Sequence, residues 1–156
     1  MKPPLRGGLE SQAWTAPELF RQFHMGPLQR VTKVVREAGI DILMLDSDGR
    51  VDLLLPLWLE AGVNMHYPLE AASDCDPLEY RRLYGKDILL MGGIDKRVLR
   101  DGCTKADIER EVMAKVPALW EQGGYSPMVD HAVPPDVPFA HFKYYLDLVN
   151  EICRNG

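Results

Sequence analysis

The stretch "IDILMLDSDGRVDLLLPLWLEAG" (residues 40–62) holds an apolar run, a short acidic loop and a second apolar run. Its first seven residues are mostly Ile, Leu and Met, as is typical of a strand buried in a parallel sheet. The second run is long enough for a helix, and Gly62 is a common helix terminator. The stretch therefore predicts a strand–loop–helix unit whose loop carries two carboxylates, Asp46 and Asp48.

Three more units of this kind follow along the chain. Predicted strands at 63–70, 88–95 and 125–130 each precede a segment with helix-start signals. These signals are Asp76 and Pro77 after the first strand, Thr104 and Asp107 after the second, and Asp136 or Pro138 after the third. Asp95 and Lys96 are expected to form an exposed helix start. Apolar strands that alternate with helices predict an α/β fold with a parallel sheet. Four units are half of a closed (β/α)₈ barrel, so the pattern fits either half a barrel or an open four-stranded sheet.

A helix is also predicted before the first strand. Thr15 and Glu18 form a capping box, Pro17 fits the first turn, and Gly39 ends the helix. Its apolar stripe comprises Phe20, Phe23, Leu28, Val31, Val34 and Val35. Such a stripe predicts that one face of the helix packs on the core.

The bulk properties bound the class of protein. The 156 residues suit one domain, which we expect at 14–156 after a flexible lead-in at 1–13 that is rich in Pro and Gly. A formal net charge of −5 argues against a nucleic-acid partner. No apolar run is long enough to span a membrane, and the first residues do not resemble a secretory signal. We therefore expect a cytoplasmic protein.

The three cysteines are expected to be free thiols. They lie far apart, without a C-x-x-C pair, as in chains of a reducing compartment. Cys153 has the helical spacing of a core residue, whereas Cys75 and Cys103 lie beside predicted turns and are expected to be exposed.

Polar residues gather where the predicted strands end, and in parallel α/β folds these carboxyl ends carry the reactive groups. Each polar residue also has a structural interpretation. The acids can cap the next helix, and the glycines can form a tight turn or admit a ligand to bare backbone. His131 is the hardest to explain structurally, because it lies between a strand end and a rigid Pro-Pro turn. The candidate site residues are Asp46, Asp48, Tyr67, Glu70, Gly92, Gly93, Asp130 and His131.

Three longer stretches carry a family resemblance. "DSDGRVDLLLPLWLEAGVNMHYPLE" (46–70), "YGKDILLMGGIDKRVL" (84–99) and "VDHAVPPDVPFAHFKYYL" (129–146) resemble the C-terminal half of the uroporphyrinogen decarboxylase superfamily. The resemblance covers about residues 15–153 and implies the later strands of a (β/α)₈ TIM barrel.

The resemblance implies two activities. Corrinoid-linked methyltransferases of the superfamily bind zinc through an H-x-C pair and a later cysteine, and these positions match Asp46, Asp48 and His131. The thiolates are absent here, but carboxylate and imidazole ligands still suit a divalent metal. The "DSDG" and "VDHAVPPD" patterns look closer to this branch, which implies a methylated small molecule as substrate and a corrinoid on a partner protein.

The alternative activity is that of a carboxy-lyase. The decarboxylases act on a tetrapyrrole without a cofactor, and His131 resembles the histidine of their "G-H-G…P" segment. Asp46, Asp48 and His131 are thus the predicted catalytic residues, and in the decarboxylase alternative His131 contacts substrate carboxylates or donates a proton. Tyr67, Glu70, Gly92, Gly93 and Asp130 are the predicted substrate ligands.

The family's N-terminal half has no counterpart in these residues. These residues are therefore expected to be either a fragment of a longer chain or a half-barrel that forms a homo-oligomer or pairs with a complementing barrel half. A third interpretation is a non-catalytic half-barrel that binds a ligand or another chain.

Overall fold

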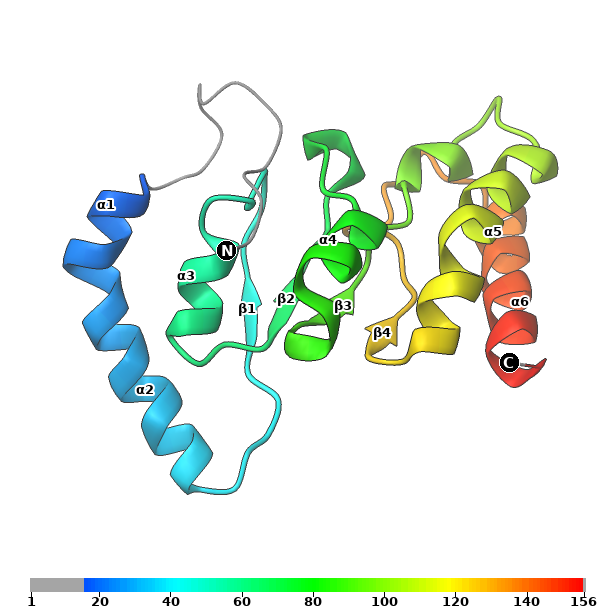
Figure 1. Ribbon diagram of the computed structural model, residues 1–156. Helices are drawn as coiled ribbons and strands as arrows, with labels where there is room; N and C mark the ends of the chain where they lie inside the picture. Colours follow the sequence, from blue (N-terminus) through cyan, green and yellow to red (C-terminus); the bar gives the residue numbers. More distant parts are fainter. Residues whose placement is uncertain (1–15, 156) are drawn as a thin grey trace.

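The computed structural model describes residues 16–155 and has four parallel strands that alternate with helices (Figure 1). The predicted lead-in at 1–13 lies outside the described residues. The strands lie in the order β1-β2-β3-β4. This confirms the predicted α/β class with a parallel sheet. The elements are α1 (Pro17–Leu19), η1 (Phe20–His24), α2 (Met25–Glu37), β1 (Met44–Asp46), α3 (Leu55–Glu60), β2 (Met65–Tyr67), η2 (Ala71–Ser73), α4 (Pro77–Tyr84), η3 (Gly85–Asp87), β3 (Leu89–Met91), η4 (Lys96–Leu99), α5 (Lys105–Gln122), β4 (Tyr125–Ser126) and α6 (Phe139–Asn155).

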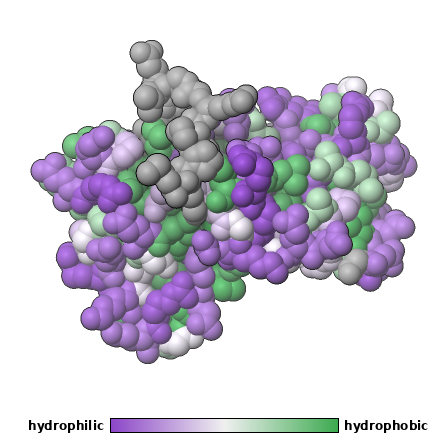
Figure 2. Space-filling view, in the orientation of Figure 1, coloured by the Kyte–Doolittle hydropathy of each residue, from purple (hydrophilic) through white to green (hydrophobic). Residues whose placement is uncertain are grey.

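Helices α3, α4 and α5 run along one face of the sheet (Figure 1). Because side chains alternate along a strand, the register assigns each residue to a face. Leu45, His66, Leu90 and Tyr125 are neighbours in the register and face the helices, where the His66 ring packs against Trp58 of α3. The helix-covered side is mostly hydrophilic where the helices meet solvent (Figure 2).

The opposite face of the sheet has two layers of side chains. Asp46, Tyr67, Met91 and Ser126 form the layer at the carboxyl ends of the strands. Met44, Met65 and Leu89 form an apolar layer beneath it. None of these seven residues is fully buried. The described chain thus leaves uncovered the face that lines the interior of a closed barrel.

Two predictions about the first elements were wrong in detail. The strand predicted at 40–46 is paired only over Met44–Asp46, and Ile42 and Met44 are 56% and 49% exposed. They are exposed because β1 is an edge strand beside an uncovered face. The helix stripe is also only partly buried: Phe20 packs in the core, whereas Phe23, Val31 and Val34 are exposed.

The later helices begin where the sequence predicts. The Asp76 side chain caps α4 by accepting a hydrogen bond from Leu78 N at 2.9 Å. Thr104 and Asp107 form a capping box at the start of α5. Of residues 16–155, no helix combines the length and the apolar character needed to cross a membrane.

Candidate functional site

The loop after β1 and the segment after β4 meet at the carboxyl end of the sheet. Asp48 Oδ1 lies 3.4 Å from His131 Nε2, and the two side chains are 53% and 42% exposed. Strands β1 and β4 are the two edges of the sheet. A flat four-stranded sheet separates its edges by roughly 14 Å. The loop after β1 and the segment after β4 therefore reach across the carboxyl end of the sheet to bring the two side chains into contact.

Asp46 and Tyr67 lie side by side on the uncovered face, next to this pair. They are register partners on β1 and β2. Burial raises the pKa of the Tyr67 phenol, and the negative charges of Asp46, Asp130 and Asp48 raise it further. The phenol thus stays protonated among three carboxylates and is available as a hydrogen-bond donor.

Asp130 is fully buried and joins the exits of three strands. Its carboxylate accepts hydrogen bonds from Ala71 N after β2, at 3.0 Å, and from Lys96 N after β3, at 3.2 Å. The Lys96 ammonium lies 3.4 Å from the same carboxylate. A buried carboxylate needs such partners, so Asp130 fixes the shape of the rim and the position of its neighbour His131.

Glu70 is turned toward the loop of Asp48. Its Oε2 accepts a hydrogen bond from Gly49 N at 2.7 Å, and the Ser73 hydroxyl donates to the same oxygen at 3.4 Å. The backbone carbonyl of Glu70 accepts from Ser73 N and Cys75 N. Glu70 is therefore engaged within the protein.

Gly92 and Gly93 are buried beneath the rim. A Cβ on Gly92 would lie 3.3 Å from Leu69 N, and one on Gly93 would lie 2.7 Å from Pro77 Cγ. Both residues also have positive φ, which favours glycine. At both positions the glycine backbone is thus in close contact with another segment of the protein. Their role as substrate ligands stays a prediction.

Two ion pairs near this loop were not predicted from the sequence. Lys96, expected to be an exposed helix start, is mostly buried against Asp130. On α5, Lys115 contacts Glu111 at 2.5 Å and also donates to Gly93 O at 2.8 Å. An i,i+4 pair normally predicts an exposed helix surface, so only the tertiary structure reveals that this pair holds the loop after β3.

A metal fits this site poorly as the described chain presents it. Within residues 16–155, no group of three or more His, Cys, Asp or Glu side chains is arranged to hold a metal ion. Asp48 and His131 form a pair, whereas protein sites for zinc usually supply three or four ligands. The predicted three-ligand set of Asp46, Asp48 and His131 is not assembled.

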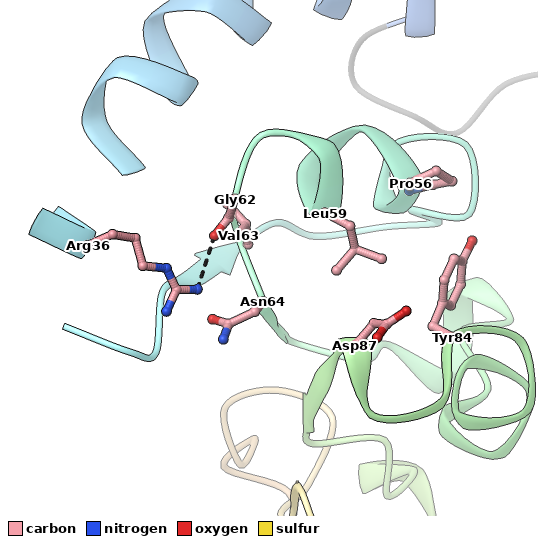
Figure 3. A pocket seen from close by; sticks show the side chains of 8 residues that line it. All are labelled: Arg36, Pro56, Leu59, Gly62, Val63, Asn64, Tyr84 and Asp87. Carbon is pink, nitrogen blue, oxygen red and sulfur yellow. Dashed lines mark hydrogen bonds between the residues drawn. The ribbon is translucent and has the colours of Figure 1, made fainter. Parts of the chain in front are cut away.

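A pocket of about 470 Å³ lies at the other end of the sheet, between α3 and α4 (Figure 3). None of the predicted site residues lines it. Two of its polar side chains are engaged by backbone groups: Arg36 donates to Gly62 O at 3.3 Å, and Asn64 bonds both Leu43 N and Asp41 O. The amino end of such a sheet usually serves stability, so the rim at the carboxyl end is the better candidate site.

The fold and the rim define an α/β protein that forms part of a parallel barrel and presents carboxylates and an imidazole at its carboxyl end. Residues 11–152 match the family model described as "Uroporphyrinogen decarboxylase (URO-D)". The chain therefore belongs to the uroporphyrinogen decarboxylase family, as its resemblance implied.

Curated relatives agree with this assignment. The chain is 28% identical over 147 residues to the "Uroporphyrinogen decarboxylase" of Maricaulis maris (strain MCS10), which covers 91% of this chain and 40% of that protein. It is also 28% identical over 151 residues to the protein of the same name from Sodalis glossinidius (strain morsitans), covering 87% and 38%. The chain thus spans about two fifths of the length of these relatives.

A solved structure shares the fold. The "methyltransferase from Methanosarcina mazei" matches with a TM-score of 0.62 and 19% identity, over 88% of this chain and 38% of that one. At this identity the likeness concerns the architecture, and it places the four strands in a TIM-barrel-like family.

Proposed function

We propose that the rim at the carboxyl end of the sheet supports methyl transfer between a small methylated compound and a corrinoid on a partner protein. The observation that carries the proposal is the contact of 3.4 Å between Asp48 and His131. A carboxylate beside an imidazole orients the ring toward a substrate, the arrangement of a general acid.

In the proposed reaction, the methyl group leaves its oxygen, nitrogen or sulfur atom and bonds to the corrinoid, which supplies the electron pair. The departing heteroatom keeps the electrons of the broken bond and takes a proton from His131. Asp48 orients the imidazole, and Asp46 and Tyr67 line the adjoining wall. The scheme requires no metal held by the chain's own residues.

The charge of the rim supports a substrate with few carboxylates. The rim carries Asp46, Asp48, Glu70 and Asp130, and its lysine, Lys96, already pairs with Asp130. A tetrapyrrole with many carboxylates needs unpaired basic side chains to bind it. The acidic rim therefore favours a neutral or cationic methyl donor.

The test is an assay of methyl transfer to reduced free cobalamin from a panel of small O-, N- and S-methyl compounds. We expect turnover by the native chain, a loss of about 100-fold or more in His131→Ala and a smaller loss in Asp48→Asn. His24→Gln, which changes an exposed histidine of η1 outside the predicted site, is the matched control. No transfer from any donor by the folded chain would contradict the proposal.

A second candidate function is tetrapyrrole decarboxylation. It is favoured by the names of the two curated relatives, each 28% identical to this chain. His131 would then donate the proton that replaces the lost carboxylate, and no cofactor is required. Release of CO₂ from uroporphyrinogen, with no methyl transfer in the parallel assay, would establish this alternative.

We also propose that further βα units cover the open face, supplied by a second copy of the chain or by a complementing barrel half. Exposed apolar side chains on β1 and α2 support this, because surfaces of this kind favour association. Sedimentation at micromolar concentration is expected to show a dimer or larger assembly. A stable, well-folded monomer would contradict this proposal, and a non-catalytic half-barrel would show assembly without turnover.

A further inference from the structure

The backbone of Gly49, next to Asp48, is held on both sides by side chains from the following unit. Gly49 N donates to Glu70 Oε2 at 2.7 Å, and the Cys75 thiol donates to Gly49 O at 3.3 Å. Gly49 has a φ of 77°, a conformation that residues other than glycine rarely adopt. The peptide units on both sides of this residue are thus fixed in a tight turn.

The two side chains that hold Gly49 are themselves held. Glu70 and Cys75 are joined by the hydrogen bond from Cys75 N to Glu70 O at 3.1 Å. Cys75 is only 2% exposed, although its place beside a turn predicted exposure. Burial raises the pKa of this thiol, so it stays protonated and able to donate.

The other end of the loop is anchored separately. Tyr80 of α4 donates to Asp52 Oδ1 at 2.6 Å, and Arg50 Nε donates to Asp52 Oδ2 at 2.5 Å. Asp52 and Tyr80 are buried, so this anchor belongs to the core. The chain on the carboxyl side of Gly49 therefore has fixed support, whichever way the Glu70 side chain points.

We infer that Glu70 and Cys75 are positioning residues that hold the Gly49 turn and thereby place the Asp48 carboxylate against His131. The inference rests on the proposed function, in which Asp48 and His131 are the reactive pair. A half-exposed ion pair contributes little to its own geometry, because two mobile side chains lose entropy when they meet. A fixed backbone reduces that loss and keeps the pair aligned.

The first experiment follows the His131 imidazole by long-range ¹H–¹⁵N NMR in the full chain. Asp48→Asn defines the signal of a ring without its carboxylate partner. Glu70→Ala, which removes the acceptor, is expected to move the His131 signals most of the way to that position. Glu70→Gln retains an acceptor oxygen and is expected to restore them in large part. Glu79→Ala, at an exposed helix position, is the matched control and is expected to leave them unchanged.

A purely structural role for Glu70 would lower the melting temperature without moving the His131 signals. His131 signals at their native positions in Glu70→Ala would therefore overturn the inference. If Glu70→Ala fails to fold, Glu70→Met, which fills a similar space without an acceptor, decides the test and is expected to move the His131 signals in the same way. Neither readout needs turnover, so a failed methyl-transfer assay would leave the result for Glu70 standing.

The second experiment uses Cys75 as a reporter of the turn. In a background of Cys103→Ser and Cys153→Ser, the reaction of Cys75 with a thiol reagent is measured in the native state. Glu70→Ala is expected to raise its rate about tenfold, because loss of one charge-assisted hydrogen bond makes local opening more frequent. An unchanged rate would show that the turn does not depend on Glu70 and would overturn the inference.

Discussion

At the amino end of the sheet, Arg81 donates hydrogen bonds to the carbonyls of Gly85, Ile88, Gly123 and Gly124. At the carboxyl end, Asp48 and His131 contact each other while about half of each side chain faces solvent. Both ends thus carry charged groups. At the amino end the Arg81 guanidinium holds backbone turns. At the carboxyl end, Asp48 and His131 stay partly accessible.

Within one sheet, the polar groups at the amino end thus serve the structure, whereas those at the carboxyl end are available for function. Arg81 has no carboxylate partner among the contacts described for it, and burial lowers the pKa of its guanidinium. It joins the loops before β3 and β4. Asp130 is the equivalent joint at the carboxyl end, since it connects the exits of β2, β3 and β4. Asp130 therefore supports the half-exposed groups at the rim.

The largest effect on stability is expected at Asp130, which joins the strand exits at the carboxyl end of the sheet. Asp130→Ala would leave the Lys96 ammonium and two backbone amides without their acceptor. We expect a loss of about 4 kcal/mol in the free energy of unfolding, measured by urea denaturation. Asp136→Ala, whose ion pair with Arg100 is exposed, is the control and should change the midpoint little. Equal effects of the two variants would contradict the role of Asp130 as a joint.

The second-largest effect is expected at Arg81, which joins loops at the amino end of the sheet. Arg81→Leu would remove the donors to four backbone carbonyls, and we expect a loss of about 3 kcal/mol by the same measurement. The neighbouring Arg82 pairs with Glu79 on the exposed side of α4, so Arg82→Leu is expected to leave the midpoint unchanged. If Arg81→Leu also lowered methyl transfer at full folding, the separation between the two ends would fail.

The stability of the core between the two ends depends on pH through His66. Burial lowers the pKa of His66 from 6.5 to about 4. The unfolded chain therefore binds this proton at a higher pH than the folded chain does. The associated stability is complete above 6.5 and is lost as the pH falls toward 4.

We expect the free energy of unfolding to fall by about 2 kcal/mol from about pH 7 to pH 5 because of His66. The measurement is urea denaturation across this range, compared with His66→Gln, in which that part of the slope should disappear. His24→Gln, at an exposed position, should retain the slope. A His66→Gln variant with the native pH dependence would show that the burial of this ring is wrong.

The smallest expected effect on stability is at the exposed pair. Asp48→Asn should change the free energy of unfolding by no more than about 1 kcal/mol, because the pair is open to solvent and screened by salt. Together with Asp130→Ala, this variant compares a buried and an exposed carboxylate within the same rim. A loss from Asp48→Asn as large as that from Asp130→Ala would make this pair another structural joint.

The sequence predicts the repeating units well because each has local signals. Asp76 and the Thr104–Asp107 capping box start α4 and α5 where expected, since caps act within a few residues. Exposure of Ile42 and burial of Cys75 were not predicted. Both depend on which strands lie at the edge and on which loops fold over one another, and no local pattern records that.

The site was predictable in outline only. Placing polar residues at strand ends brought Asp48 and His131 onto one rim, because parallel strands share their carboxyl end. The partners of Asp130 and Glu70 were not predictable, since each bonds backbone amides that have no signature in the sequence. Lys96 likewise reads as a surface residue until the buried carboxylate beside it is known.

The central claim is that the loops after the two edge strands meet across the carboxyl end of the sheet. A crystal structure of the chain at neutral pH tests it most directly, through the separation of Asp48 Oδ1 and His131 Nε2. We predict a contact close to 3.4 Å. Side chains separated by roughly 14 Å, the width of a flat four-stranded sheet, would contradict the claim and remove the basis of the proposed function.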